Sequence, residues 1–491
     1  MKQLKELFSD TIIYGISSVL ARFIGYLLVP IHTGVFQRDE YAVVSLVFSA
    51  IALFNVFFTL GMESSYLRYG KDREKARDLF KTLQIFLLLS SVVLLAIVWF
   101  VKPLLLPQLG ITNGTNIYLM MMGILLFDTL TIVPFAELRL VQRAKLFAVL
   151  RTGNVVVNLG LNVYLILFLK MGVEAVFISN LCASILTTIA VWAFTYKMLL
   201  GKWNREILYK SLRFGLPFVP AGIGYVINEM IDRFYLLEIP ESTIQTLYGT
   251  GFTAEDLVGA YSACYKLAVF MLLLVQMYRM AWQPFFMRKS DDVTAPKIFA
   301  ESFKYFNVAA AAIFLFVSLF AQQIVALKIP FTNFNLVGEQ YWIALPIVPV
   351  LLAAYWFQGW YINFSAGIFI AEKTKELAKI TLIGATVTLL MNFILVPKFG
   401  MMGSAWATLA SYFIMALLIY RYSVKSFKVP YNLLLSFGVI LIASAAVYSK
   451  SYVMEIISSE LGASLLLFSV TIALIGYITV GKFFGQTSSS K

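Results

Sequence analysis

The stretch that decides the fold is the first apolar run, residues 11–36, which reads TIIYGISSVLARFIGYLLVPIHTGVF. It exceeds the roughly 17–25 residues that a helix needs to cross a bilayer. Arg22 lies near its middle. A charge at that depth costs roughly 2.5–3.5 kcal/mol, and such a residue normally faces a polar interior. Arg22 is therefore the first candidate for a functional residue.

Runs of the same kind follow along the whole chain, which is 60% hydrophobic and only 13% charged. A soluble chain could not bury so much apolar surface. About fourteen segments are long enough to span a membrane, and each must be helical, because isolated strands cannot satisfy their backbone in lipid. The sequence thus predicts an all-α polytopic membrane protein. Its expected spans are 11–34, 41–67, 79–101, 117–138, 147–169, 174–196, 211–237, 258–286, 303–327, 341–370, 377–397, 401–420, 431–449 and 460–481.

Basic residues are distributed unevenly between the two sides of these spans. Most of the 39 Lys and Arg lie in the N-terminus and in every second segment after it. The alternate segments hold only Arg38, Lys102, Lys170, Lys328, Lys398 and Lys450. This asymmetry follows the positive-inside rule and predicts that both termini are cytoplasmic. The net charge of +13 therefore indicates topology rather than nucleic-acid binding, and membrane lipids are expected partners.

The chain offers little chemistry for catalysis or metal binding. Its two cysteines, Cys182 and Cys264, fall in predicted spans, and His32 is its single histidine. No Walker motif, Gly-rich phosphate loop, HExxH motif or Ser-His-Asp set is visible in the sequence. Every segment between the spans is short. We therefore predict a protein that is not an enzyme, without a cofactor or a metal site.

A long-range similarity links two parts of the chain. A span containing Asn162 is followed by Lys170-Met-Gly172, and a later span containing Asn392 is followed by Lys398-Phe-Gly400. This similarity predicts two related halves of six helices in the same orientation. Chance similarity between apolar helices is the alternative. The predicted organisation is a first lobe at 1–200, a second lobe at 201–425, and two additional helices with a short tail at 426–491.

Charged residues cluster within the predicted seventh span. Asn228, Glu229, Asp232 and Arg233 fall within two helical turns. Glu229 and Arg233 are four residues apart and could neutralise each other, which explains them as well as a functional site does. Asp232 would then lack a local partner, so we expect it to meet another helix, a proton or a cation. Glu229 and Asp232 are candidate ion-coupling residues, and Arg233 is a candidate for substrate binding.

Other ionisable residues are scattered among the predicted spans. Arg22 lies on a stripe of small and polar residues, typical of a bundle interior, where it either lines a cavity or forms a buried ion pair. The eighth span carries Lys266 near its outer end and Arg279 near its inner end. Asp128, an isolated acid in the fourth span, is a further candidate ion-coupling residue. Arg68 closes the second span near the cytoplasm, where snorkelling is the simpler explanation.

Several stretches, taken in order, match a known pattern. They are 35–44 (VFQRDEYAVV), 61–69 (GMESSYLRY), 215–220 (GLPFVP), 232–235 (DRFY), 258–261 (VGAY) and 392–403 (NFILVPKFGMMG). Their order and spacing over the first twelve spans resemble bacterial polysaccharide flippases of the Wzx type. One minor departure is Ala42 after Tyr41, where a glycine is expected.

The resemblance implies the fold of the multidrug/oligosaccharidyl-lipid/polysaccharide exporter superfamily, with two six-helix lobes around a central cavity and two extra helices. It implies that undecaprenyl-diphosphate-linked oligosaccharide moves from the inner to the outer leaflet of the bacterial inner membrane by alternating access. A polysaccharide polymerase is a candidate partner. Cations in such a cavity would bind the diphosphate, and the candidates in this chain are Arg22, Arg279, Lys266, Arg233 and Arg68.

Two alternatives remain open. A drug/cation antiporter of the same superfamily is the nearer one, and the acids Asp128 and Asp232 keep it open. A membrane glycosyltransferase or polysaccharide polymerase is a weaker one, because such enzymes usually carry a large outer loop or domain that this chain lacks.

Overall fold

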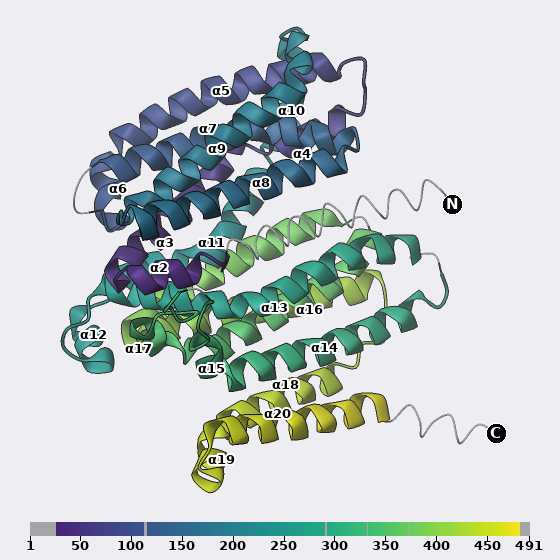
Figure 1. Cartoon of the computed structure of the whole chain (residues 1–491). Coiled ribbons are helices and arrows are strands. Elements are labelled where there is room, and N and C mark those ends of the chain that lie inside the picture. Colours follow the sequence, from purple (N-terminus) through teal and green to yellow (C-terminus); the bar gives the residue numbers. More distant parts are fainter. Residues whose placement is uncertain (1–25, 112–114, 290–291, 331, 372, 482–491) are drawn as a thin grey trace. The chain divides into compact units, whose positions relative to one another are not determined.

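Helices make up nearly all of the structure, a computed structural model that describes residues 26–111, 115–289, 292–330, 332–371 and 373–481 (Figure 1). The chain divides into two compact units, Met1–Ser262 and Ala263–Lys491. Within the described residues, nine helices are long and apolar enough to cross a membrane, and two bent helix pairs raise the number to as many as eleven. The protein is therefore an all-helical, multi-span membrane protein. Most of the predicted first span, including Arg22, lies outside the described residues.

The first unit contains mainly long helices that run side by side (Figure 1). Its elements are α2 (Val29–Val35), α3 (Arg38–Thr59), α4 (Met62–Tyr69), α5 (Ala76–Phe100), α6 (Lys102–Gln108), α7 (Asn116–Leu140), α8 (Ala144–Val163), η1 (Tyr164–Phe168), α9 (Glu174–Thr195), η2 (Tyr196–Leu200), α10 (Arg205–Gly215), α11 (Phe218–Leu237) and α12 (Glu241–Tyr248). Helix α13 (Ala254–Lys289) begins in this unit and continues into the second.

Two helix breaks meet in the first unit. Between α3 and α4, Leu60 and Gly61 have positive φ angles of 47° and 69°. Between α10 and α11 the chain bends by 43° beside Pro217. A Cβ on Gly61 would lie 2.4 Å from the carbonyl oxygen of Gly215, so only glycine fits at this contact. The break between α3 and α4 therefore packs directly against the end of α10, and the absence of a side chain on Gly61 allows the two backbones to come into contact.

The second unit continues from α13 into a further set of helices. They are α14 (Ala295–Leu319), α15 (Ala321–Val325), η3 (Glu339–Ala344), α16 (Ile347–Ile370), α17 (Thr374–Ser426), α18 (Leu433–Tyr448), α19 (Lys450–Ile457), α20 (Glu460–Gly476) and η4 (Tyr477–Gly481). Helices of both units cover the predicted spans from residue 41 onward.

Helix α17 is a helical hairpin rather than one rod. Gly400 interrupts it with φ 55° and ψ −131°, a conformation that only glycine adopts readily. On either side of this turn, Ser404 Oγ donates to Asn392 Oδ1 at 2.9 Å. Farther from the turn, Ser411 Oγ donates to the Gly384 carbonyl oxygen, also at 2.9 Å. The pairs are evenly spaced around the turn, so the two halves are antiparallel.

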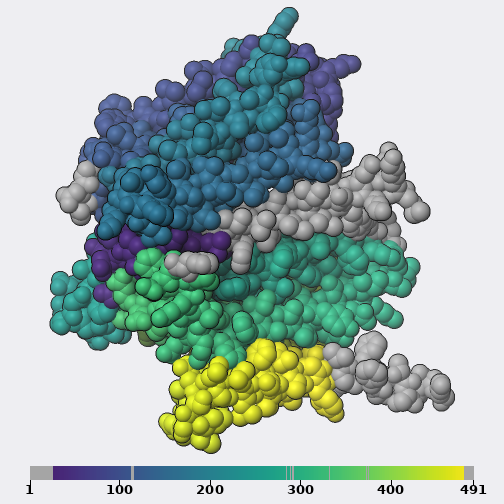
Figure 2. All heavy atoms as spheres, viewed as in Figure 1, coloured from purple at the N-terminus to yellow at the C-terminus, as the bar shows by residue number. Residues whose placement is uncertain are grey.

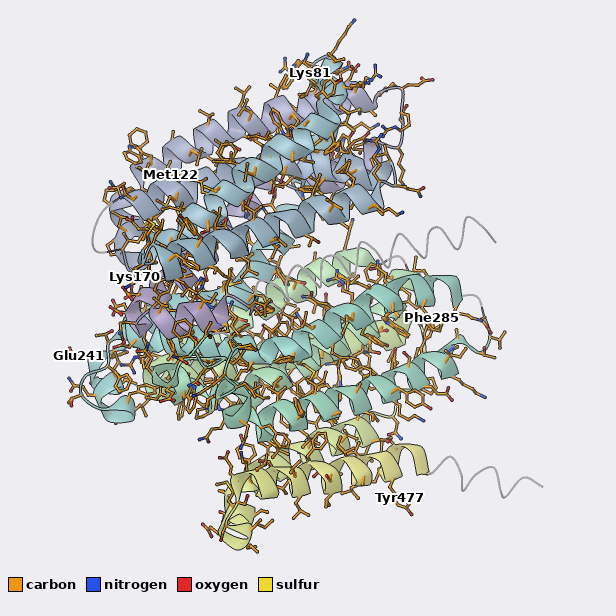
Figure 3. The ribbon with its side chains drawn as sticks, in the orientation of Figure 1. Lys81, Met122, Lys170, Glu241, Phe285 and Tyr477 are labelled. Atoms are coloured by element: carbon orange, nitrogen blue, oxygen red, sulfur yellow. The ribbon has the colours of Figure 1, made fainter. Side chains whose placement is uncertain are left out.

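The first unit contains a comparable hairpin, formed by α8, η1 and α9. Asn154 Nδ2 donates to Thr187 Oγ1 at 2.8 Å, which joins the two arms. Lys170, with φ 51°, lies in the turn and is labelled in Figure 3. In the same view Lys81 lies at the opposite end of this unit's helices, whereas Glu241 lies at the same end as Lys170.

Helices α18 and α20 pack on α14 in the second unit. Lys450 Nζ and Ser464 Oγ donate to the Leu319 carbonyl oxygen at the end of α14, at 2.7 and 2.9 Å. The buried Asn307 accepts hydrogen bonds from Trp356 and Trp360 and donates one to Ser436 on α18. Figure 2 shows α18 to α20, in yellow, as a continuous block. Large apolar side chains are exposed there, Leu434 by 86% and Leu441 by 68%, as expected for a lipid-facing surface.

Candidate functional site

A buried charge cluster joins α11 and α13 in the first unit. Asp232 Oδ1 accepts a hydrogen bond from Arg233 Nη1 at 2.6 Å and another from the Arg233 backbone N–H at 2.9 Å. Tyr261 Oη, from the start of α13, donates to Asp232 Oδ2 at 2.6 Å. Asp232 is 2% exposed and Arg233 is 5% exposed. The carboxylate therefore meets a cation and a phenol in a desolvated environment.

The pairing within this cluster differs from the expectation. Arg233 forms its ion pair with its neighbour Asp232, and its Nη1 donates to the main-chain oxygen of Glu229 at 2.5 Å. The expectation that Asp232 lacks a local partner is therefore wrong, because the adjacent Arg233 folds back onto its carboxylate. The expected contact with another helix is present, since Tyr261 on α13 donates to Asp232. Removing one member of such a buried pair typically costs about 3–5 kcal/mol.

Helix α3 holds the two helices of the cluster in place. Ser49 Oγ contacts Met230 Sδ on α11 at 3.5 Å, and Ser45 Oγ lies 2.7 Å from Ser262 Oγ on α13. At the start of α3, Arg38 Nε donates to Asp256 Oδ1 at 3.1 Å. These polar contacts fix where Tyr261 lies relative to α11.

Asp128 on α7 is the second acid inside a candidate span. Its Oδ1 accepts a hydrogen bond from Ser184 Oγ on α9 at 2.7 Å, and the charge of Arg151 on α8 acts on it. Like Asp232, it therefore has both a hydrogen-bond donor and a cation near it. The description of Asp128 as isolated holds only along the sequence, because its neighbours come from two other helices.

Arg279 on α13 is in a different situation. Its side chain is exposed, and it makes no ion pair with any residue in the described ranges. Within those ranges, the charge of Arg279 acts on Tyr361 of α16. A cation within a candidate membrane span that remains exposed can meet an anion from outside the chain.

Comparison with known proteins places this arrangement in a family. A family described as "Polysaccharide biosynthesis protein" matches residues 7–290, more than half of the chain. The chain belongs to this family. A comparison with curated proteins gave no match. The family consists of transporters, so this member is not an enzyme.

Solved structures share the fold of this family member. The lipid II flippase MurJ, in an inward closed conformation, superposes with a TM-score of 0.74 at 14% identity, over 96% of this chain and 100% of that one. An inward-facing MATE multidrug transporter of the MOP superfamily gives 0.62 at 15% identity, over 84% and 94%. A MOP superfamily transporter from Pyrococcus furiosus gives 0.55 at 14%, over 86% and 94%. At these identities the likeness establishes the MOP superfamily fold alone.

Arg68 on α4, another predicted substrate residue of this polysaccharide biosynthesis family member, contacts an aromatic ring. The guanidinium of Arg68 lies 4.8 Å from the ring centre of Phe214 on α10, which ties α4 to α10. Lys266 is half-buried on α13. Arg22 lies outside the described residues. The structure thus brings Glu229, Asp232 and Arg233 together on α11, while Asp128 lies on α7 and Arg279 lies on the part of α13 that belongs to the second unit.

One network was missed by the sequence interpretation. Arg73 donates to both carboxylate oxygens of Glu137 on α7, at 3.0 and 2.6 Å, and Tyr66 Oη donates to Glu137 Oε2 at 2.8 Å. The hydrogen bond with Glu137 raises the pKa of Arg73, which lies in the loop after α4. An acid within the predicted span 117–138 was the available signal. This network fastens the loop to α7 and so has a structural explanation.

Proposed function

We propose that this protein is a flippase for undecaprenyl-diphosphate-linked oligosaccharide. It moves this lipid from the inner to the outer leaflet of the bacterial inner membrane by alternating access, for the synthesis of a surface polysaccharide. A polysaccharide polymerase is the expected partner that receives the lipid.

The observation that carries the proposal is a contrast between acids and cations inside the candidate spans. Asp232 is engaged by Arg233 and Tyr261, and Asp128 by Ser184 beside Arg151. Arg279 is exposed. An antiporter for cationic drugs would need accessible acids, so this contrast favours an anionic cargo. Membership of a polysaccharide biosynthesis family supports a glycan as the rest of that cargo.

Physical chemistry supports the same cargo. A sugar headgroup that crossed bare hydrocarbon would lose water at every hydroxyl, at a cost of several kcal/mol each. A polar cavity open to one leaflet at a time removes that barrier. Arginine suits a diphosphate, because its planar guanidinium makes paired, charge-assisted hydrogen bonds.

The proposed architecture has fourteen spans, with six-helix lobes at 1–200 and 201–425 and two further helices at 426–491. The hairpins of α8–α9 and α17 support related lobes, because each hairpin contains one copy of the repeated sequence pattern. Both termini are cytoplasmic in this proposal. Single cysteines at positions 75 and 246, in a chain lacking Cys182 and Cys264, would test it. Only position 246 should react with an impermeant reagent outside intact cells.

The function itself is tested by deleting the gene in its host and extracting the lipids. Diphosphate-linked glycan should accumulate in the inner leaflet, and the wild-type gene should restore export. Arg279→Ala and Arg22→Ala should fail to restore it at normal protein levels, whereas Arg421→Ala, which removes an exposed arginine near the end of α17, should restore it. Normal export by a strain without the gene would refute the proposal.

A further inference from the structure

We propose that Arg151 on α8 forms a binding site for the phosphate group of a membrane lipid. This site is separate from the charge cluster of α11 and α13, and it does not depend on which cargo the protein carries. Arg151 lies within the candidate span Ala144–Phe168, yet its side chain is exposed. Few residues of this span are fully buried, and most of α8 is half-buried.

The guanidinium of Arg151 is held by aromatic rings and by no hydrogen bond. Its central carbon lies 4.2 Å from the ring centre of Phe135 on α7 and 5.8 Å from that of Phe147 on its own helix. It donates no hydrogen bond to any residue in the described part of the chain. Stacking of this kind fixes the plane of the group while leaving its N–H edge available. An arginine offers five N–H donors, so the Arg151 guanidinium can donate paired hydrogen bonds to an acceptor from outside the described chain.

The nearest acid does not fill this requirement. Asp128 acts on Arg151 through its charge, but the two form no ion pair, and Asp128 Oδ1 is engaged by Ser184 Oγ at 2.7 Å. The carboxylate offsets part of the positive charge and orients the guanidinium from one side.

Arg151 lies in the first half of α8, near the end at which the candidate span begins. It lies seven residues after Ala144, which is about 10 Å along the axis at the usual helical rise. Side chains on a helix point back toward its N-terminus, so the guanidinium reaches toward the membrane surface at which α8 begins. Long basic side chains extend to the headgroup level in this way. Arginine binds phosphate with paired, charge-assisted hydrogen bonds.

Two sources supply the same chemistry: a phospholipid headgroup, or the diphosphate end of a carrier lipid on its way into the protein. Native mass spectrometry of the purified full chain distinguishes them, with phosphatidylglycerol, undecaprenyl diphosphate and uncharged diacylglycerol as separate probes. The variants are Arg151→Gln and Arg151→Lys. Arg143→Gln is the matched control, because it removes a charge from the same end of α8 in a residue that stacks on no described ring.

We expect Arg151→Gln to weaken binding of at least one phosphate lipid by about tenfold, the effect of losing a charge-assisted hydrogen bond. Arg151→Lys should retain part of the binding, and Arg143→Gln most of it. Diacylglycerol should bind equally to all variants. Loss confined to undecaprenyl diphosphate identifies an entry site for the carrier, and loss of phosphatidylglycerol identifies an annular lipid site. Equal binding of both phosphate lipids to Arg151→Gln and wild type, with equal melting temperatures, overturns the proposal.

Discussion

Two hairpins of the molecule carry the same sequence pattern: one is formed by α8, η1 and α9, and the other lies within α17. They differ in how the buried asparagine and the turn are stabilised. Each has an asparagine with no exposed surface near its turn, Asn162 in the first and Asn392 in the second. Asn392 is satisfied inside its own hairpin by Ser404. Asn162 Oδ1 instead lies 3.0 Å from His32 Nε2 on α2, and its Nδ2 donates to Asn158.

The turns differ as well. In the first hairpin the positive φ angle falls on Lys170, whereas in the second it falls on Gly400. The matching glycine of the first hairpin, Gly172, has open space around the position of a Cβ. A shared sequence pattern therefore specifies a hairpin and a buried amide, but the neighbouring helices decide how the amide and the turn are completed.

The largest expected effect separates the two glycines. Gly400→Ala should destabilise the protein by about 2–3 kcal/mol, because alanine is strained at this φ and ψ. Gly172→Ala should be close to neutral. Thermal unfolding of the two purified variants measures the difference. Equal midpoints would show that the two turns are equivalent after all.

The next effect concerns the buried amide of the second hairpin. Asn392→Ala leaves the Ser404 hydroxyl buried without its acceptor and should cost about 1–2 kcal/mol. Combining it with Ser404→Ala should restore part of that loss, because both partners are then apolar. A double-mutant cycle on thermal stability checks this. Strict additivity of the two substitutions would contradict the contact.

The amide of the first hairpin should have a consequence outside the hairpin. Asn162→Leu removes the hydrogen bond to His32, worth about 1 kcal/mol, and should loosen α2. Hydrogen exchange of the Val29–Val35 backbone should become faster, while Asn392→Leu should leave that segment unchanged. Faster exchange in α2 with both variants would mean that the two asparagines are not specific to their partners.

The smallest effect is a gain. Lys170→Gly relieves a left-handed conformation but adds freedom to the unfolded chain, so we expect a net stabilisation of about 0.5 kcal/mol. Lys170→Ala, the control, keeps the strain and should give no gain. A lower melting temperature for Lys170→Gly than for wild type would show that the side chain, and not the turn, matters here.

Much of the fold could be predicted from the sequence, because lipid forces every spanning segment to be an apolar helix. The helices after residue 41 cover the predicted spans, and the all-helical, multi-span fold followed from their length and hydropathy. The described residues contain nine to eleven candidate spans, where about fourteen were predicted for the whole chain. The candidate site was harder. Glu229, Asp232 and Arg233 were found, but the ion pair of Arg233 with Asp232 was not predicted. Tyr261 could not be named as the partner from another helix, because it is distant in sequence. Arg151 lay within the predicted span 147–169, but the sequence could not predict that its guanidinium stacks on the ring of Phe135 on another helix.

The sequence by itself determined that this is a helical membrane protein with ionisable residues inside its spans, because hydropathy and charge act on each segment separately. Only the tertiary structure decided which of those residues are engaged. Asp232 and Asp128 receive donors from other helices, whereas Arg279 and Arg151 stay exposed. An ionic partner is set by distance in space, and in a helical bundle that distance depends on how helices far apart in sequence pack against one another.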